Sequence, residues 1–274
     1  QLHCWIPVGC TELDWLETLN ALRIEGKIDQ IGVSIRDNRP EDGVAPARLW
    51  LPTYDGTGQA THPDILGPGG GSRPFVLAFT PYPFSADRYE NPSVLVADDG
   101  LRFREERRGL NPLVPAPPTD HNDDPDLFFL DGEYAILYLE TLRPEGQNLV
   151  LLRSRDRLSW RRSVAASFDL RGAGAGPFIL SPALAERDGE LYLFYVNRSA
   201  SPYRIEFLQG RDASSWSGLE TRQPVFDSLP FVPWHIDVVE GGGSYYMLMT
   251  SVGKDASGRR GYGLRVARSA DLES

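Results

Sequence analysis

Two stretches of this chain, DLFFLDGEYAILYLET (126–141) and ALAERDGELYLFYVN (183–197), follow one plan. Each begins with a short apolar run, turns at Asp-Gly, and continues as an alternating run rich in Tyr, Leu and Val. Asp-Gly between two such runs favours a tight β-hairpin, because glycine readily adopts the positive φ that the turn requires. The shared plan therefore predicts two antiparallel hairpins and indicates an internal repeat.

Two sets of markers show that the plan recurs with one period. The first set opens each unit and consists of HPD (62–64), DPD (124–126), SPA (181–183) and HID (235–237). Their last positions are 62, 57 and 54 residues apart. The second set closes each unit with an aspartate, at Asp99, Asp156, Asp212 and Asp271, in steps of 57, 56 and 59 residues. A unit of about 55 residues with four strand-like runs is typical of a propeller blade.

The expected fold is all-β, a five-bladed β-propeller with four-stranded antiparallel blades around a central pocket. Four copies occupy residues 62–274, the last of them truncated, and residues 1–61 have about the length of one more blade. Within that part, 11–22 has a helical pattern with a capping box, and 48–56 has the pattern of a strand and turn. We expect one domain over 1–274, in which 1–61 completes or closes the ring. A solenoid is an alternative, and so is a β-sandwich, although sandwiches do not usually repeat a four-strand unit.

Composition limits the partners of the chain. The formal net charge is −10, whereas nucleic acids and anionic membranes attract basic surfaces. No apolar run approaches the roughly 18 residues of a membrane span, so we expect no membrane insertion. Cys4 and Cys10 form either a small disulfide loop or two separate thiols, and their spacing does not fit a structural zinc site. We expect a secreted, periplasmic or cell-surface protein, and leave its oligomeric state open.

Propeller geometry selects the candidate binding residues, because three places in each blade converge on one mouth. They are the start of the first strand, the end of the second and the start of the third. The first-strand starts contribute His62, Asp64, Asp124, Asp126, Trp234, His235 and Asp237, with His121 just before the second copy. The ends of second strands contribute Glu140 and Asn197, and the approaches to third strands contribute Glu90, Asn91 and Arg204.

Several carboxylates among polar and aromatic side chains, without a nucleophilic Ser or Cys constellation, suggest glycoside chemistry. A glycosidase needs one protonated carboxyl to donate to the leaving oxygen and one ionised carboxyl to activate water or attack carbon. Crowding acids at one mouth raises some of their pKa values, which suits the acid role. The simpler alternatives are that these aspartates cap turns, that the histidines are satisfied core groups, and that Arg204 pairs with Glu206.

The stretch DDPDLFFLDGEYAILYLE (123–140) resembles the second-blade motif of the five-bladed β-propeller glycosidases of glycoside hydrolase family 43 and its relatives. HPDIL (62–66) is similar to their first-blade motif, and the resemblance covers roughly residues 62–270. It implies a general base from the first blade, a pKa-tuning Asp from the second and a general acid Glu from the third. Asp64 matches the first to within two positions, and Asp124 matches the second. Leu180-Ser181-Pro182 stands where the family has Glu-Gly-Pro.

We therefore predict a glycoside hydrolase that cleaves a poly- or oligosaccharide, furanosides included, with either retention or inversion. Asp64, Asp124 and Glu140 are the predicted catalytic carboxyls, and Glu140 is preferred to Glu90 as proton donor because it ends an apolar strand at the mouth. The missing third-blade Glu motivates the alternative, a non-catalytic carbohydrate-binding propeller; a structural propeller that presents loops to a protein is a further one. We expect no required cofactor and assign no metal ligand, although the oxygen-rich axis could hold a structural calcium ion.

Overall fold

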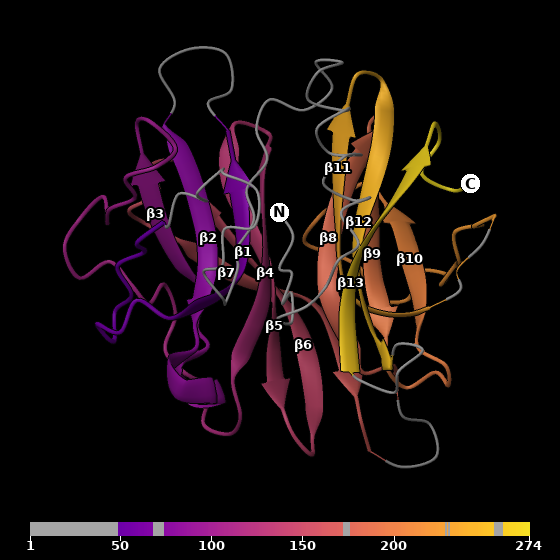
Figure 1. Ribbon diagram of the computed structural model, residues 1–274, viewed down its shortest axis with the longest axis horizontal. Coiled ribbons are helices and arrows are strands. Elements are labelled where there is room, and N and C mark those ends of the chain that lie inside the picture. Colours follow the sequence, from indigo (N-terminus) through magenta and orange to yellow (C-terminus); the bar gives the residue numbers. More distant parts are fainter. Residues whose placement is uncertain (1–48, 68–73, 172–175, 228, 230, 255–259) are drawn as a thin grey trace.

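The computed structural model describes residues 49–67, 74–171, 176–227, 229, 231–254 and 260–274. Within this part the chain is all-β, with antiparallel sheets and two short 3-10 turns, Pro83–Ser85 and Asp87–Tyr89 (Figure 1). The predicted helix at 11–22 and both cysteines lie outside the described residues. No helix in the described ranges is long and apolar enough to span a membrane.

Four sheets follow one another along the chain, as the repeat predicts. The first contains β1 (Ala60–Leu66), β2 (Phe75–Pro81) and β3 (Ser93–Ala97), and the second contains β4 (Asn122–Leu130), β5 (Glu133–Leu142), β6 (Gly146–Ser154) and β7 (Arg161–Asp169). The third contains β8 (Ile179–Arg187), β9 (Glu190–Asn197) and β10 (Arg204–Gly210), and the fourth contains β11 (Val232–Gly241), β12 (Ser244–Lys254) and β13 (Arg260–Ser269). The isolated bridges Val96–Arg104 and Phe207–Arg222 add one pair of residues beyond the third strand of the first and third sheets.

The predicted Asp-Gly hairpins are confirmed. Asp131 and Gly132 join β4 to β5 with φ values of 53° and 77°, and Asp188 and Gly189 join β8 to β9 with 54° and 77°. Both residues of a two-residue hairpin turn take positive φ in the type that suits twisted strands, and Asp tolerates this better than most residues. Local turn chemistry therefore sets the register of both hairpins.

The aspartate that closes each repeat has the same local role in all four copies. Its side-chain oxygen accepts hydrogen bonds from the backbone N–H groups two and three residues later, as at Asp99, Asp156 and Asp271, or two residues later, as at Asp212. Such turns satisfy backbone donors where a strand ends. The marker repeats because the same turn is needed once in every unit.

Adjacent sheets pack face to face, and the core lies between them. Val76, Ile136 and Tyr138 belong to the cluster between the first and second sheets. Similar clusters separate the second sheet from the third and the third from the fourth. The innermost strands β1, β4, β8 and β11 contact their neighbours in that order and lie near the middle of the molecule (Figure 1).

Three details differ from the sequence-based expectation. Residues 49–53 form no strand, although the turn after them is present and Gly56 N–H donates to the Thr53 carbonyl. The first strand of the first copy begins at Ala60, because it continues through the bulge described below. The first, third and fourth sheets contain three strands in the described residues instead of the expected four.

Candidate functional site

The innermost strand of every sheet breaks its register at the same place. The breaks fall between Thr61 and Asp64, Asp123 and Asp126, Leu180 and Ala183, and Pro233 and Ile236. In the first three copies a proline follows the bulged residue, and proline has no N–H to donate to a strand ladder. A bulge of this kind redirects a side chain, and bulges are frequent beside active sites.

The bulged residues of the first three sheets hold a backbone conformation that is unfavourable for their type. His62, Asp124 and Ser181 have φ values of 47°, 49° and 48°. A non-glycine residue in this region costs of order 1–3 kcal/mol, which the surrounding structure must offset. The first three sheets share this unfavourable conformation at equivalent positions, and all three side chains line the same pocket. The conformation is therefore a recurring feature of these three copies.

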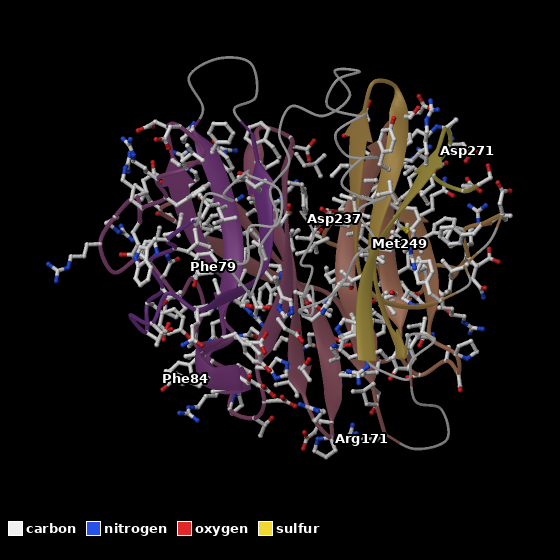
Figure 2. All side chains as sticks on the ribbon, in the orientation of Figure 1. Phe79, Phe84, Arg171, Asp237, Met249 and Asp271 are labelled. Atoms are coloured by element: carbon white, nitrogen blue, oxygen red, sulfur yellow. The ribbon has the colours of Figure 1, made fainter. Side chains whose placement is uncertain are left out.

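A central pocket lies where the four innermost strands meet. Its polar lining residues are His62, Asp64, Asp124, Asp126, Ser181, His235 and Asp237, and prolines and Ile236 complete the wall. Figure 2 shows Asp237 toward the middle of the molecule, whereas Phe84 and Asp271 lie at its edge. The pocket therefore gathers acids and imidazoles from segments that are far apart in the sequence.

Asp124 stands between two histidines from other sheets. Its Oδ1 lies 3.2 Å from His62 Nε2 and 3.5 Å from His235 Nδ1. The two imidazole rings have centroids 5.0 Å apart. One potential ligand atom from each of these three residues lies within 4.8 Å of the others, a spacing at which one metal ion can contact all three.

Each histidine has a second partner that orients its ring. His62 Nδ1 lies 3.3 Å from Glu90 Oε2 and 3.3 Å from Thr80 Oγ1. His235 Nδ1 lies 2.7 Å from Ser181 Oγ. In metal-binding histidines, a partner on the ring nitrogen that faces away from the metal fixes the tautomer. Glu90 and Thr80 contact that nitrogen of His62, whereas Ser181 contacts the same His235 nitrogen that faces Asp124.

The two histidines have opposite pKa shifts. Burial disfavours a charged His62, but the carboxylates of Asp124 and Glu90 outweigh it and raise the pKa of His62 to about 9. Burial lowers the pKa of His235 to about 4 against the attraction of Asp124, and the charges of His62 and Arg198 act in the same direction as burial. The ring of His62 is thus charged at neutral pH and the ring of His235 is neutral. Two charged rings with centroids 5.0 Å apart would repel each other.

The carboxylates of the inner strands also join neighbouring blades. Asp124 Oδ2 accepts a hydrogen bond from Ser181 N–H at 2.8 Å, and Asp126 Oδ2 accepts one from Leu184 N–H at 2.9 Å. Asp64 Oδ2 likewise accepts one from Leu127 N–H. Burial, together with the charge of Asp237, raises the pKa of Asp64 to about 6. These acids therefore combine a backbone-binding role with a place in the pocket wall.

A second cluster lies beside the pocket, around His121. Its Nε2 lies 3.1 Å from Asp123 Oδ2, and its Nδ1 contacts Asp120, which Arg143 also pairs. Burial disfavours a charged His121, but its carboxylate partners, Asp123 first, raise its pKa to about 9. Burial, with the charges of Asp124 and Glu90, raises the pKa of Asp123 to about 7 although His121 opposes this.

The structure brings most of the predicted site residues together. His62, Asp64, Asp124, Asp126, His235 and Asp237 line the pocket. Glu90 lies behind His62, and Trp234 packs edge-on against His235 with centroids 5.7 Å apart. Six residues selected by the register of the repeat thus line one pocket.

Four predicted residues have other partners. Glu140 accepts hydrogen bonds from Arg162 and Asn148, each at 2.8 Å, and is not part of the pocket wall. Asn197 bonds Glu206 and the backbone of the next loop, Arg204 pairs with the same Glu206, and Asn91 bonds Tyr54 and Asn122. For Arg204 this is the simpler alternative considered from the sequence.

Two residues beside the pocket were not among the predicted site residues. Ser181 occupies the bulge of the third blade, and its place in the SPA marker is a signal that register analysis could have used. Arg198 follows β9 and lies close enough for its charge to act on His235. No motif marks Arg198 in the sequence.

Comparison with known proteins in sequence gives one short match. No family model matches the chain. Over 81 residues the chain is 36% identical to the A type blood N-acetyl-alpha-D-galactosamine deacetylase of Flavonifractor plautii. The match covers 28% of this chain and 10% of the relative, so the chain spans about a tenth of that protein's length.

Comparison of structures shows the fold. An N-acetylgalactosamine deacetylase from F. plautii, in complex with blood group B trisaccharide, aligns with a TM-score of 0.68 at 19% identity, over 84% of this chain and 72% of the other. The alpha-L-arabinanase of Cellvibrio cellulosa aligns with a TM-score of 0.53 at 12% identity, over 79% and 72%. A family-43 glycoside hydrolase aligns with the same TM-score at 12% identity, over 81% and 79%. These alignments confirm the expected resemblance in fold to propeller glycosidases, and at these identities they show the fold alone.

Proposed function

We propose that the central pocket is the active site of a carbohydrate-active hydrolase that removes the acyl group of an N-acylated sugar. The observation that carries this proposal is the convergence of His62, Asp124 and His235, whose potential ligand atoms lie within 4.8 Å of one another. The structural likeness to an N-acetylgalactosamine deacetylase supports the choice of reaction.

The donor set fits a divalent transition metal ion. Two imidazole nitrogens and one carboxylate oxygen suit zinc, iron or manganese better than calcium, which prefers oxygen ligands throughout. Glu90 behind His62 supplies the outer contact that such sites use. When bound, a metal ion at this site would polarise the carbonyl of an amide for attack by water.

The remaining pocket residues would hold the sugar. Asp64, Asp126 and Asp237 come from three different sheets and can accept hydrogen bonds from sugar hydroxyls. Pro63, Pro125 and Pro182 provide apolar wall between these acids. We infer that the substrate presents its N-acyl group to the histidines and its hydroxyls to the acids.

Glycoside hydrolysis, the reaction predicted from the sequence, is the second candidate. It is favoured by the three carboxylates in the pocket wall and by the likeness to family-43 and arabinanase structures. In that case the proton donor would be one of these acids, because Glu140 is paired with Arg162 outside the pocket wall.

We also propose that the ring has five blades. The face of the first sheet that points away from the second sheet also carries buried apolar side chains, those of Leu77, Phe79 and Leu95. A further blade built from residues 1–59 would account for that burial. Deleting residues 1–48 should therefore lower the melting temperature strongly, and an unchanged melting temperature would exclude the fifth blade.

One assay separates the functions. The chain is treated with a chelator, supplied with zinc or manganese, and incubated with glycans that end in N-acetylgalactosamine or arabinofuranose. Released acetate and new reducing ends are measured in parallel. We expect acetate that depends on metal and disappears in His235→Ala. New reducing ends without acetate would favour the glycosidase, and neither product despite measurable binding would favour the non-catalytic binding protein.

A further inference from the structure

Beside the pocket, three aromatic rings surround the guanidinium group of Arg198. Its Cζ lies 5.0 Å from the ring centroid of Phe178, 5.0 Å from that of Trp234 and 5.8 Å from that of Tyr203. Trp234 and Tyr203 stack with centroids 6.3 Å apart. The rings come from the segment before β8, from the approach to β10 and from β11, so three chain segments build this cage.

Hydrogen bonds hold the Arg198 backbone at the end of β9, the central strand of the third sheet. Arg198 N–H donates to the Phe178 carbonyl at 2.8 Å, and Phe178 N–H donates to Ser199 Oγ at 2.9 Å. The side chain therefore starts from a hydrogen-bonded position directly after β9.

The guanidinium group of Arg198 lacks an acidic partner among the described residues. Within the described part of the chain Arg198 forms no ion pair, and its Nε is buried without a hydrogen-bond partner. A buried polar group that lacks a partner costs free energy and calls for an explanation. Stacking on aromatic rings stabilises the cation but supplies no acceptor for the buried Nε–H.

Two other arginines at this end of the sheets are neutralised by the protein. Arg143 pairs with Asp120, and Arg204 pairs with Glu206. These pairs show that the chain places acids beside its arginines here. Because Arg198 is arranged differently, we expect the hydrogen-bond acceptor for its guanidinium group to come from a bound ligand.

The cage adjoins the pocket through Trp234, whose ring packs edge-on against His235 at 5.7 Å between centroids. A saccharide that reaches the histidines with one sugar unit would therefore bring a neighbouring unit to Trp234 and Arg198. Aromatic faces stack on sugar rings, and the planar guanidinium matches a carboxylate with two parallel hydrogen bonds.

We propose that Arg198, Trp234 and Tyr203 form a subsite for a carboxylate-bearing sugar, such as a uronic acid, next to the sugar that enters the pocket. The proposal rests on the carbohydrate activity proposed above and specifies its substrate class as acidic saccharides. The acidic pocket wall would repel a carboxylate, so Arg198 also determines which sugar unit faces the histidines.

The test is a binding measurement with a matched pair of ligands. An unsulfated chondroitin tetrasaccharide alternates N-acetylgalactosamine with glucuronate, and reduction of its carboxyl groups gives a neutral counterpart of the same length. Calorimetry on the intact chain, with and without zinc, compares the two. We expect the acidic ligand to bind about tenfold or more tightly than the neutral one.

Variants assign the preference to Arg198. Arg198→Gln should weaken binding of the acidic ligand about tenfold while the neutral ligand changes little, and Arg198→Lys should fall between because it lacks the planar fork. Arg265→Gln is the matched control, since Arg265 also stacks on an aromatic ring, Phe231 at 5.9 Å, but belongs to β13. Thermal melts verify that each variant is folded.

Each contrary result overturns a different claim. Equal affinity for the two ligands, or an equal loss for both in Arg198→Gln, would show that the cage is structural and overturn the subsite. If neutral N-acetylated glycans still release acetate in that case, the proposed function stands without the subsite. If neither ligand binds and no glycan in the panel reacts, the subsite and the proposed function both fail.

Discussion

Asp124 is the residue on which the pocket depends most. Its two oxygens serve different elements, since Oδ1 faces the two histidines and Oδ2 accepts the backbone N–H of Ser181. Burial would raise the pKa of Asp124, but His62, His235 and the Ser181 N–H hold it below its usual value. An ionised carboxylate at this place both holds its neighbours and supplies a metal ligand.

Asp124→Asn should abolish metal-dependent turnover and weaken metal binding at least about tenfold, because the amide carries no charge to attract the ion. Isothermal titration with zinc and the acetate assay would measure this. Asp131→Asn is the control, since Asn suits an Asp-Gly hairpin turn equally well. Unchanged zinc affinity in Asp124→Asn would contradict the assignment of the ligand.

His121 predicts a pH dependence of stability. Its pKa in the folded state is raised to about 9, whereas an unperturbed histidine titrates near 6.5. The folded state therefore binds the His121 proton more tightly than the unfolded state does. The stability that comes from charged His121 and its carboxylate partners is present below about pH 6.5 and is lost as pH rises through about 9. His121→Gln should flatten the decline of melting temperature between pH 6.5 and 9. If the melting temperature of the variant falls equally steeply over this pH range, groups other than His121 cause the pH dependence.

Among the elements, the bulged first strands convert a repeated fold into a site. The bulge places His62, Asp124 and Ser181 at equivalent positions, yet each blade uses the position differently. Two copies present a group that can bind a metal, and the third presents a hydroxyl to His235. One backbone device thus carries three side chains with different roles.

Ser181 allows the backbone and side-chain roles of the bulge to be separated. Ser181→Gly removes the hydroxyl but relieves the positive φ of 48°, so its melting temperature should stay within a few degrees of the parent. Ser181→Ala keeps the strain and should be less stable than the glycine variant. Both should lower zinc affinity about tenfold, because both remove the contact to His235. If zinc affinity is unaffected in both, Ser181 does not position that ring.

At the scale of the whole molecule, stability comes from layers between sheets. Leu193 of β9 is fully buried in the cluster shared by the second and third sheets. Leu193→Ala should lower the free energy of unfolding by about 2–5 kcal/mol, since it removes apolar contacts and leaves a cavity. Val164→Ala on β7, where the side chain is 45% exposed, is the control and should cost about 0.5 kcal/mol or less. Chemical denaturation would measure both, and equal losses would contradict a core between sheets.

Much of this arrangement could be predicted from the chain because it depends on residues close in sequence. The Asp-Gly hairpins and the closing aspartates satisfy backbone groups within a few positions, so they recur as readable markers. Six residues selected by the register of those markers lie together in one pocket wall. The strand expected at 48–56 failed because pattern alone supplies no pairing partner.

The sequence by itself determined the repeat, the hairpins and the inward position of the HPD, DPD, SPA and HID markers, since these follow from turn chemistry and period. Only the tertiary structure decided which groups meet. It paired Glu140 with Arg162, brought His62 and His235 to Asp124, and placed Arg198 among aromatic rings with no acidic partner in the described residues. The contacts that join Asp124 to Ser181 and Ser181 to His235 link blades more than fifty residues apart, and their distances depend on how whole sheets pack. The chemistry of the pocket is therefore a property of the assembled sheets.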